Sequence, residues 1–113
     1  MSIEGLWTIV FSGQFGAGAG VVVFETGRIF GGDTSMYYIG DYEVKNGFLS
    51  GNVRVRVHAK VPGMMPVTGI NDFTATLPAA QIGETMQVTC DVTNPPDTGL
   101  KIQAKLHKIA ELP

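Results

Sequence analysis

The segment that decides the fold is "VRVRVHAK", residues 53–60, in which apolar side chains alternate strictly with charged or polar ones. Alternate residues of a β-strand point to opposite faces of the sheet, so a period of two indicates a strand with one buried face. A helix would need a period near 3.6 instead. We therefore expect the valines of this segment to face a core and its cations, Arg54, Arg56 and Lys60, to face away from it.

Seven further segments have the character of strands. Three downstream segments repeat the alternation, at residues 72–77, 86–93 and 100–107. Four upstream segments are more apolar on both faces, at residues 6–12, 17–24, 28–31 and 36–44. Glycine, proline, asparagine and aspartate, which favour turns, stand between the segments. The chain is thus predicted to form eight strands.

The connections between these strands favour a closed barrel. No window of eleven or more residues has a convincing helical period, and the best candidate, residues 77–82, is one turn at most. An open sheet with so many short strands leaves edges that promote aggregation, whereas a closed barrel has none. We predict one all-β domain over residues 1–113: a closed, eight-stranded, antiparallel up-and-down β-barrel with little or no helix. Such a barrel is filled by its side chains or holds one small ligand.

The composition argues against nucleic-acid-binding and membrane-spanning proteins. Eight basic and ten acidic residues give a net charge of −2, whereas nucleic-acid-binding domains are normally basic. The longest apolar run, residues 18–24, is far shorter than the roughly 20 residues that cross a bilayer. Glu4 stands where a signal peptide carries basic residues, and the single cysteine, Cys90, suits a reducing compartment. We expect a cytoplasmic protein with no direct nucleic-acid binding and no membrane span.

The stretch "RIFGGDTSMYYIGDYEV", residues 28–44, has two interpretations. In the structural one, paired glycines form a turn and Asp33 accepts hydrogen bonds from nearby backbone amides. In the functional one, Tyr38 and Tyr42 lie on one strand face and line a cavity or an interface, where a ring with a polar tip is useful. The residues assigned to the structural turn are Gly31, Gly32, Asp33 and Gly40.

These residues also belong to a set of motifs found in a known family. The chain opens with Gly5-Leu6-Trp7, continues with Gly31-Gly32-Asp33 and Tyr38-Ile39-Gly40, and closes with strands containing "VTCDV" and "KIQAKL". In the order and spacing of these motifs the chain resembles the GrlR-like family, lipocalin-like negative regulators of type III secretion in bacteria.

The resemblance implies a small eight-stranded β-barrel that forms a homodimer and acts by binding. The family's named member binds a transcriptional activator and keeps it off DNA, and its relation to lipocalins implies an apolar interior suited to a lipid-like ligand. That member grips the activator through a run of acids on a surface loop. The matching residues here, 42–51, contain Glu43 as their single acid.

Large side chains expected inside the barrel either fill it or line a narrow pocket, and the sequence leaves both open. Trp7 belongs to a Gly-x-Trp motif like the one whose indole plugs one end of lipocalin barrels, and an ordinary buried tryptophan is the alternative. The inward candidates are Trp7, Ile9, Phe11, Phe24, Tyr38, Tyr42, Phe48, Phe73, Met86 and Leu106. All of them except Phe48 and Leu106 are candidate residues for binding a small hydrophobic ligand.

The loop "VPGMMPVTG", residues 61–69, carries two methionines and two valines where loops are normally polar. Methionine adapts to irregular surfaces, so a dimer contact and a flap over the barrel mouth are both considered, with a loop folded back as a plug as the alternative. The candidate partner or dimer contacts are Met64, Met65, Val67 and Glu43. The cations expected to face outward, either to solubilise the sheet or to meet an acidic partner, are Arg54, Arg56, Lys60, Lys101, Lys105 and Lys108.

Few residues have the pattern that catalysis needs. His58 and His107 have no second ligand at metal-binding spacing, so neither a metal nor another cofactor is expected. Cys90 falls on the apolar face of its strand, where a thiol is unreactive. We therefore expect a non-enzymatic binding protein of the regulator type, with a lipocalin-like carrier or sensor of a small hydrophobic ligand as the alternative.

Overall fold

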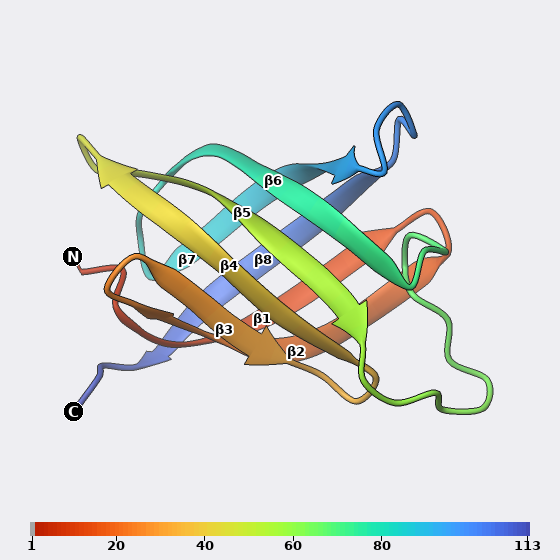
Figure 1. Ribbon diagram of the computed structural model, residues 1–113. Helices are drawn as coiled ribbons and strands as arrows, with labels where there is room; N and C mark the ends of the chain where they lie inside the picture. The colour runs from red at the N-terminus through yellow and green to blue at the C-terminus, as the bar shows by residue number, and fades with distance from the viewer. Residues whose placement is uncertain (1) are drawn as a thin grey trace.

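Eight antiparallel strands follow one another in chain order and close into a barrel in the computed structural model, which describes residues 2–113 (Figure 1). The strands are β1 (Gly5–Gly13), β2 (Gly16–Glu25), β3 (Arg28–Gly32), β4 (Met36–Lys45), β5 (Phe48–Val57), β6 (Asp72–Gln81), β7 (Thr85–Asn94) and β8 (Lys101–Ala110). The prediction of a closed, eight-stranded, up-and-down barrel is confirmed. The described residues contain no helix.

The barrel closes because its first strand pairs with its last. Ile9 of β1 lies opposite Leu106 of β8, and Phe11 lies opposite Ala104. All consecutive strands in the chain also pair with each other, so each strand has a partner on both sides. Both chain ends emerge at the end of the barrel where β1 begins (Figure 1).

The strands alternate between buried and exposed residues as the sequence predicts. On β7, Met86, Val88 and Cys90 are buried, and on β5, Val53 faces an interior cavity. The best helical candidate, residues 77–82, is strand up to Gln81 instead. Pro78 is tolerated there because it lies in a bulge of β6, where Pro78 and Ala79 stand opposite the single residue Ser50 of β5 and a residue without an N–H disrupts no regular ladder.

Two residues lie on the opposite face from the one predicted. Phe48, expected inside, is 45% exposed, whereas Leu49 is 1% exposed. Counted back from Val53, the period of two places position 49 inside, so Phe48 is left at the hairpin tip. Lys108, expected to face outward, has a side chain only 6% exposed, because it follows the outward-facing position 107 and therefore turns to the other face.

Candidate functional site

One end of the barrel is filled by aromatic rings. Trp7 is completely buried, and its Nε1–H donates a hydrogen bond to the backbone oxygen of Ile3 at 2.9 Å. The Phe24 ring meets the indole edge-on at 5.9 Å between centroids and meets the Tyr42 ring at 5.4 Å. We call this region, where β1 begins and β4 finishes, the Trp7 end. These rings plug this end of the barrel, and the buried indole N–H has a hydrogen-bond partner.

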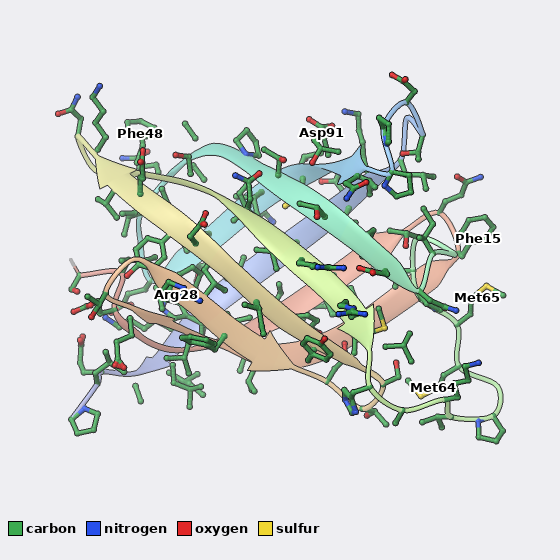
Figure 2. All side chains as sticks on the ribbon, in the orientation of Figure 1. Phe15, Arg28, Phe48, Met64, Met65 and Asp91 are labelled. Atoms are coloured by element: carbon green, nitrogen blue, oxygen red, sulfur yellow. The ribbon has the colours of Figure 1, made fainter. Side chains whose placement is uncertain are left out.

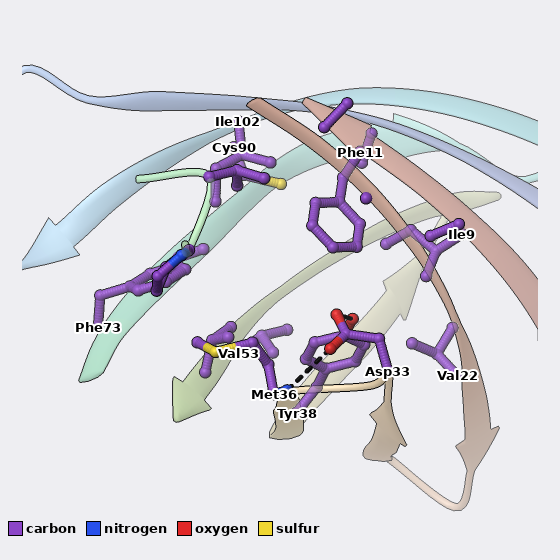
Figure 3. Close-up of a pocket in the computed structure, with 18 of the residues that line it drawn as sticks. Ile9, Phe11, Val22, Asp33, Met36, Tyr38, Val53, Phe73, Cys90 and Ile102 are labelled. Carbon is purple, nitrogen blue, oxygen red and sulfur yellow. Dashed lines mark hydrogen bonds between the residues drawn. The ribbon is translucent and has the colours of Figure 1, made fainter. Parts of the chain in front are cut away.

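The opposite end, which we call the open end, contains a cavity of about 160 Å³ (Figure 3). All eight strands contribute to its wall, which is mainly aliphatic or small and includes the rings of Phe11, Phe24, Tyr38 and Phe73. The cavity reaches the surface beside Met64 and Met65, which are exposed. This volume is close to that of dry apolar cavities that accept benzene and smaller than the roughly 300 Å³ of the smallest typical drug-sized pockets.

The residues predicted to face the interior divide between these two ends. Ile9, Phe11, Phe24, Tyr38 and Phe73 line the cavity. Trp7, Tyr42 and Met86 are buried but do not line it. The period of two does not separate residues of the cavity wall from buried residues of the Trp7 end, because it indicates which face of a strand is buried and not how far along the barrel a residue lies.

Both interpretations of residues 28–44 describe part of the structure, but the turn is made by Asp33 and the residues after it, whereas Gly31 and Gly32 lie in β3 and Gly40 lies in β4. The Asp33 carboxylate accepts hydrogen bonds from the backbone N–H groups of Ser35, at 3.0 Å, and Met36, at 2.8 Å, through Oδ1. Its Oδ2 accepts a hydrogen bond from the Tyr38 hydroxyl. Asp33 and Tyr38 also line the cavity, so the turn and the cavity share a carboxylate (Figure 3).

The Tyr38 hydroxyl is held in its protonated form. Burial raises the pKa of the Tyr38 phenol above its ordinary value, and the hydrogen bond and negative charge of Asp33 raise this pKa further. The hydroxyl therefore remains a donor to Asp33. Asp33 was predicted only as a turn residue. Its contact with Tyr38 depends on the direction in which β4 leaves the turn, which the sequence does not give.

Glycines give the adjacent backbones room to approach. A Cβ atom at Gly20 would lie 2.6 Å from the backbone oxygen of Gly32 and 2.9 Å from the Tyr38 hydroxyl oxygen. A Cβ atom at Gly40 would lie 2.1 Å from the backbone oxygen of Asn52 on β5. Gly40 therefore fits the close strand pairing, whereas Gly20 also makes room for the polar pair in the cavity.

The long loop between β5 and β6 is partly folded back on the barrel. Val67 and Thr68 are buried, and the Val67 oxygen accepts a hydrogen bond from the Phe15 N–H at 3.0 Å. The prediction that Val67 contacts a partner is therefore wrong, because its side chain is buried and lines the cavity. Met64 and Met65 instead project from the loop at the cavity mouth (Figure 2). The buried part of the loop thus acts as a plug, and the two exposed methionines form an apolar rim beside it.

A row of apolar residues crosses the outside of the barrel, and it was not predicted from the sequence. Direct cross-strand register aligns Leu6, Val23, Phe30 and Ile39 on β1 to β4; we call these residues the outer apolar row. Phe30 and Ile39 are exposed, and the guanidinium carbon of Arg28 lies 5.5 Å from the centre of the Phe30 ring. The sequence feature that could have predicted this row is the presence of apolar residues on both faces of the four upstream strands. Glu43 is exposed near the far end of β4.

The outward cations are largely paired with acids. Arg54 contacts Asp72 at 2.9 Å and Arg56 contacts the same carboxylate at 3.5 Å. Hydrogen bonding to Arg54 holds the pKa of the Asp72 carboxyl below its usual value. Lys101 pairs with Asp91. The cations of β5 and β8 therefore stabilise contacts between adjacent strands and do not form an unneutralised basic patch.

The remaining reactive groups are isolated. Cys90 lines the cavity, and burial, with a smaller contribution from the charge of Asp91, raises the pKa of its thiol to about 11. Within residues 2–113, no group of three or more histidine, cysteine, aspartate and glutamate side chains is placed to hold a metal ion. Over the same residues, no helix is long and apolar enough to cross a membrane.

Neither a protein-family model nor a curated protein sequence matches this chain.

Proposed function

We propose that the protein is a non-enzymatic binding protein that holds a small apolar molecule in the open end of its barrel. The observation that carries this proposal is the cavity of about 160 Å³. Protein interiors are normally packed to the density of organic crystals, so a cavity larger than a few water molecules is unusual. At the Trp7 end, by contrast, the indole is completely buried and lines no cavity.

The size and the rim of the cavity define the ligand. A volume near that of a benzene-binding cavity suits a small aromatic or a short alkyl chain. Met64 and Met65 lie at the mouth and are exposed. Methionine has flexible, polarisable side chains that adapt to irregular partners, so these two residues suit a cover for such a ligand.

The lining favours binding over catalysis. Its thiol, Cys90, has a pKa raised to about 11, and none of the lining residues is a histidine or a lysine that could act as its base. The Asp33 carboxylate is engaged by two backbone amides and the Tyr38 hydroxyl. These groups have the character of an orienting polar contact in an apolar pocket.

Titration with toluene, followed by NMR, tests the proposal. We expect saturable shifts for residues of the cavity wall such as Val53 and Val88, and much smaller shifts around Trp7. Ala75→Leu places a larger side chain in the wall and should abolish binding, whereas Ala79→Leu, on the exposed part of the same strand, should leave it intact. Absence of binding to the unaltered protein, or equal binding by both variants, would contradict the proposal.

We also propose that the outer apolar row binds another protein, beginning with a second copy of the chain. Apolar residues aligned across four strands, of which Phe30 and Ile39 are exposed, support this, because contiguous apolar patches mark interaction surfaces. The resemblance to GrlR-like regulators supports a homodimer that captures a transcriptional activator in the bacterial cytoplasm. Glu43 lies on β4, the strand that also carries Ile39, and belongs to the same candidate surface.

Analytical ultracentrifugation of two lysine variants tests the proposal that the outer apolar row forms a dimer contact. Ile39→Lys places a charge in the outer apolar row and should shift a dimer to monomer. Val10→Lys, at an exposed position of β1 outside that row, should not. A chain that remains monomeric at all concentrations, or a dimer that is indifferent to Ile39→Lys, would refute this assignment.

A further inference from the structure

The cavity wall carries a charge of one sign. Among its lining residues, Asp33 is the single acid, and none is a lysine, an arginine or a histidine. The nearest imidazole, that of His58, is exposed and contacts the backbone oxygen of Asp33 at 3.0 Å through Nε2, so it donates to the turn. The hydroxyl residues Thr34 and Ser35 of the same turn also line the cavity, but the charge offered to a ligand is that of Asp33, which is paired with Tyr38.

This pair has capacity to accept a further hydrogen bond. An ionised carboxylate offers about four lone-pair positions, and the Ser35 amide, the Met36 amide and the Tyr38 hydroxyl use three of them. The Tyr38 hydroxyl donates its proton to Asp33, so its oxygen keeps lone pairs free to accept. Both groups can therefore accept from a ligand, while neither has a proton left to donate.

We propose that the cavity selects small amphiphiles whose polar end is a hydrogen-bond donor or a cation, such as a primary amine, and rejects those ending in a carboxylate. This inference rests on the proposed ligand-binding function of the cavity. A charge-assisted hydrogen bond between an ammonium group and Asp33 stabilises the bound amine. A carboxylate in the same place meets a like charge, is removed from water and finds no cation to compensate it.

Three probes with the same alkyl chain test this selectivity: hexylamine, 1-hexanol and hexanoate. At about pH 8 the amine is a cation and the carboxylate is an anion. Calorimetric or NMR titration of the whole chain should give the tightest binding for hexylamine and at least about tenfold weaker binding for hexanoate. Because only the polar ends differ, the order of affinities reports the polar end of the site and not its apolar volume.

A pair of charge-matched variants locates the effect. Asp33→Asn retains an oxygen that can accept from the turn amides and removes the charge, so it should weaken hexylamine at least about tenfold and change hexanol by less than about threefold. Asp41→Asn makes the same change in net charge at an exposed position of β4 and should alter neither affinity. If Asp33→Asn does not fold, the order of affinities in the unaltered protein still decides the matter.

The outcomes separate this inference from the function on which it rests. Hexanoate that binds as tightly as hexylamine, or amine binding that Asp33→Asn leaves unchanged, would overturn the selectivity while the cavity remains a ligand site. Failure of all three probes and of toluene to bind would remove the ligand-binding function itself.

Discussion

At the Trp7 end, the Phe24 ring packs edge to face with the rings of Trp7 and Tyr42, and the indole lines no cavity. At the open end, the same strands carry Ala17, Gly18 and Ala104 on the wall, and about 160 Å³ remains empty. The difference shows that side-chain volume, set separately for each end, decides whether a small barrel has a solid core or a pocket.

The difference in packing predicts unequal costs of truncating an aromatic ring. Trp7→Ala removes a fully buried side chain and should lower the free energy of unfolding by about 3–5 kcal/mol. Phe11→Ala removes a ring that is half-buried beside existing empty space and should cost about 1–2 kcal/mol. Denaturant unfolding measures both. Equal costs would mean that the two ends are packed alike.

Alkylation of Cys90 probes the wall of the open end. Since burial raises the pKa of this thiol to about 11, its thiolate is scarce at neutral pH. Iodoacetamide should therefore modify it at least about a hundredfold more slowly than an exposed thiol. Mass spectrometry of native and urea-unfolded protein gives the two rates. Saturating toluene should slow the native reaction further, and a native rate equal to the unfolded one would contradict the placement of Cys90.

Glycine at the open end is required by backbone approach, which Gly20→Ala tests. Its new methyl group would lie 2.6 Å from the Gly32 oxygen, so we expect a loss of about 1–3 kcal/mol in unfolding free energy. Gly83→Ala is the matched control, because the nearest atom to its new Cβ is 3.6 Å away. That variant should change stability by no more than about 0.5 kcal/mol. Similar losses in both would remove the special role of Gly20.

The ion pair of Arg54 and Asp72 should contribute least. Both side chains are exposed, and surface pairs are screened by water, so Asp72→Asn should barely change the unfolding midpoint at neutral pH. The folded-state pKa of Asp72 is lowered, so any stabilisation is present above the ordinary pKa of aspartate and is lost as the pH falls below about 4. A difference between the proteins that grows in acid would contradict this sign.

The sequence predicted the barrel well because its evidence is local. The alternation along residues 86–93 and 100–107 specifies each strand, and the need to avoid open edges specifies closure. The same period of two, counted back from Val53 and onward from Leu106, also places Leu49 and Lys108 on the inner face. The alternation does not predict the place of Pro78 in a strand, since it depends on a bulge of β6 itself.

The site was only partly predictable because it depends on distances along the barrel. Ile9, Phe11 and Phe73 were expected inside, but nothing in the period of two separates them from Trp7. The contact between Asp33 and Tyr38 needs Gly20 on another strand to be small. The outer apolar row depends on the cross-strand register of four strands, which a single sequence does not report.

Crystallography under xenon pressure tests most directly the claim that one end is solid and the other is hollow, because xenon enters dry apolar cavities. We predict a xenon peak among Phe11, Val53 and Val88 and none beside Trp7. A filled open end without xenon, or a peak next to the indole, would contradict the account.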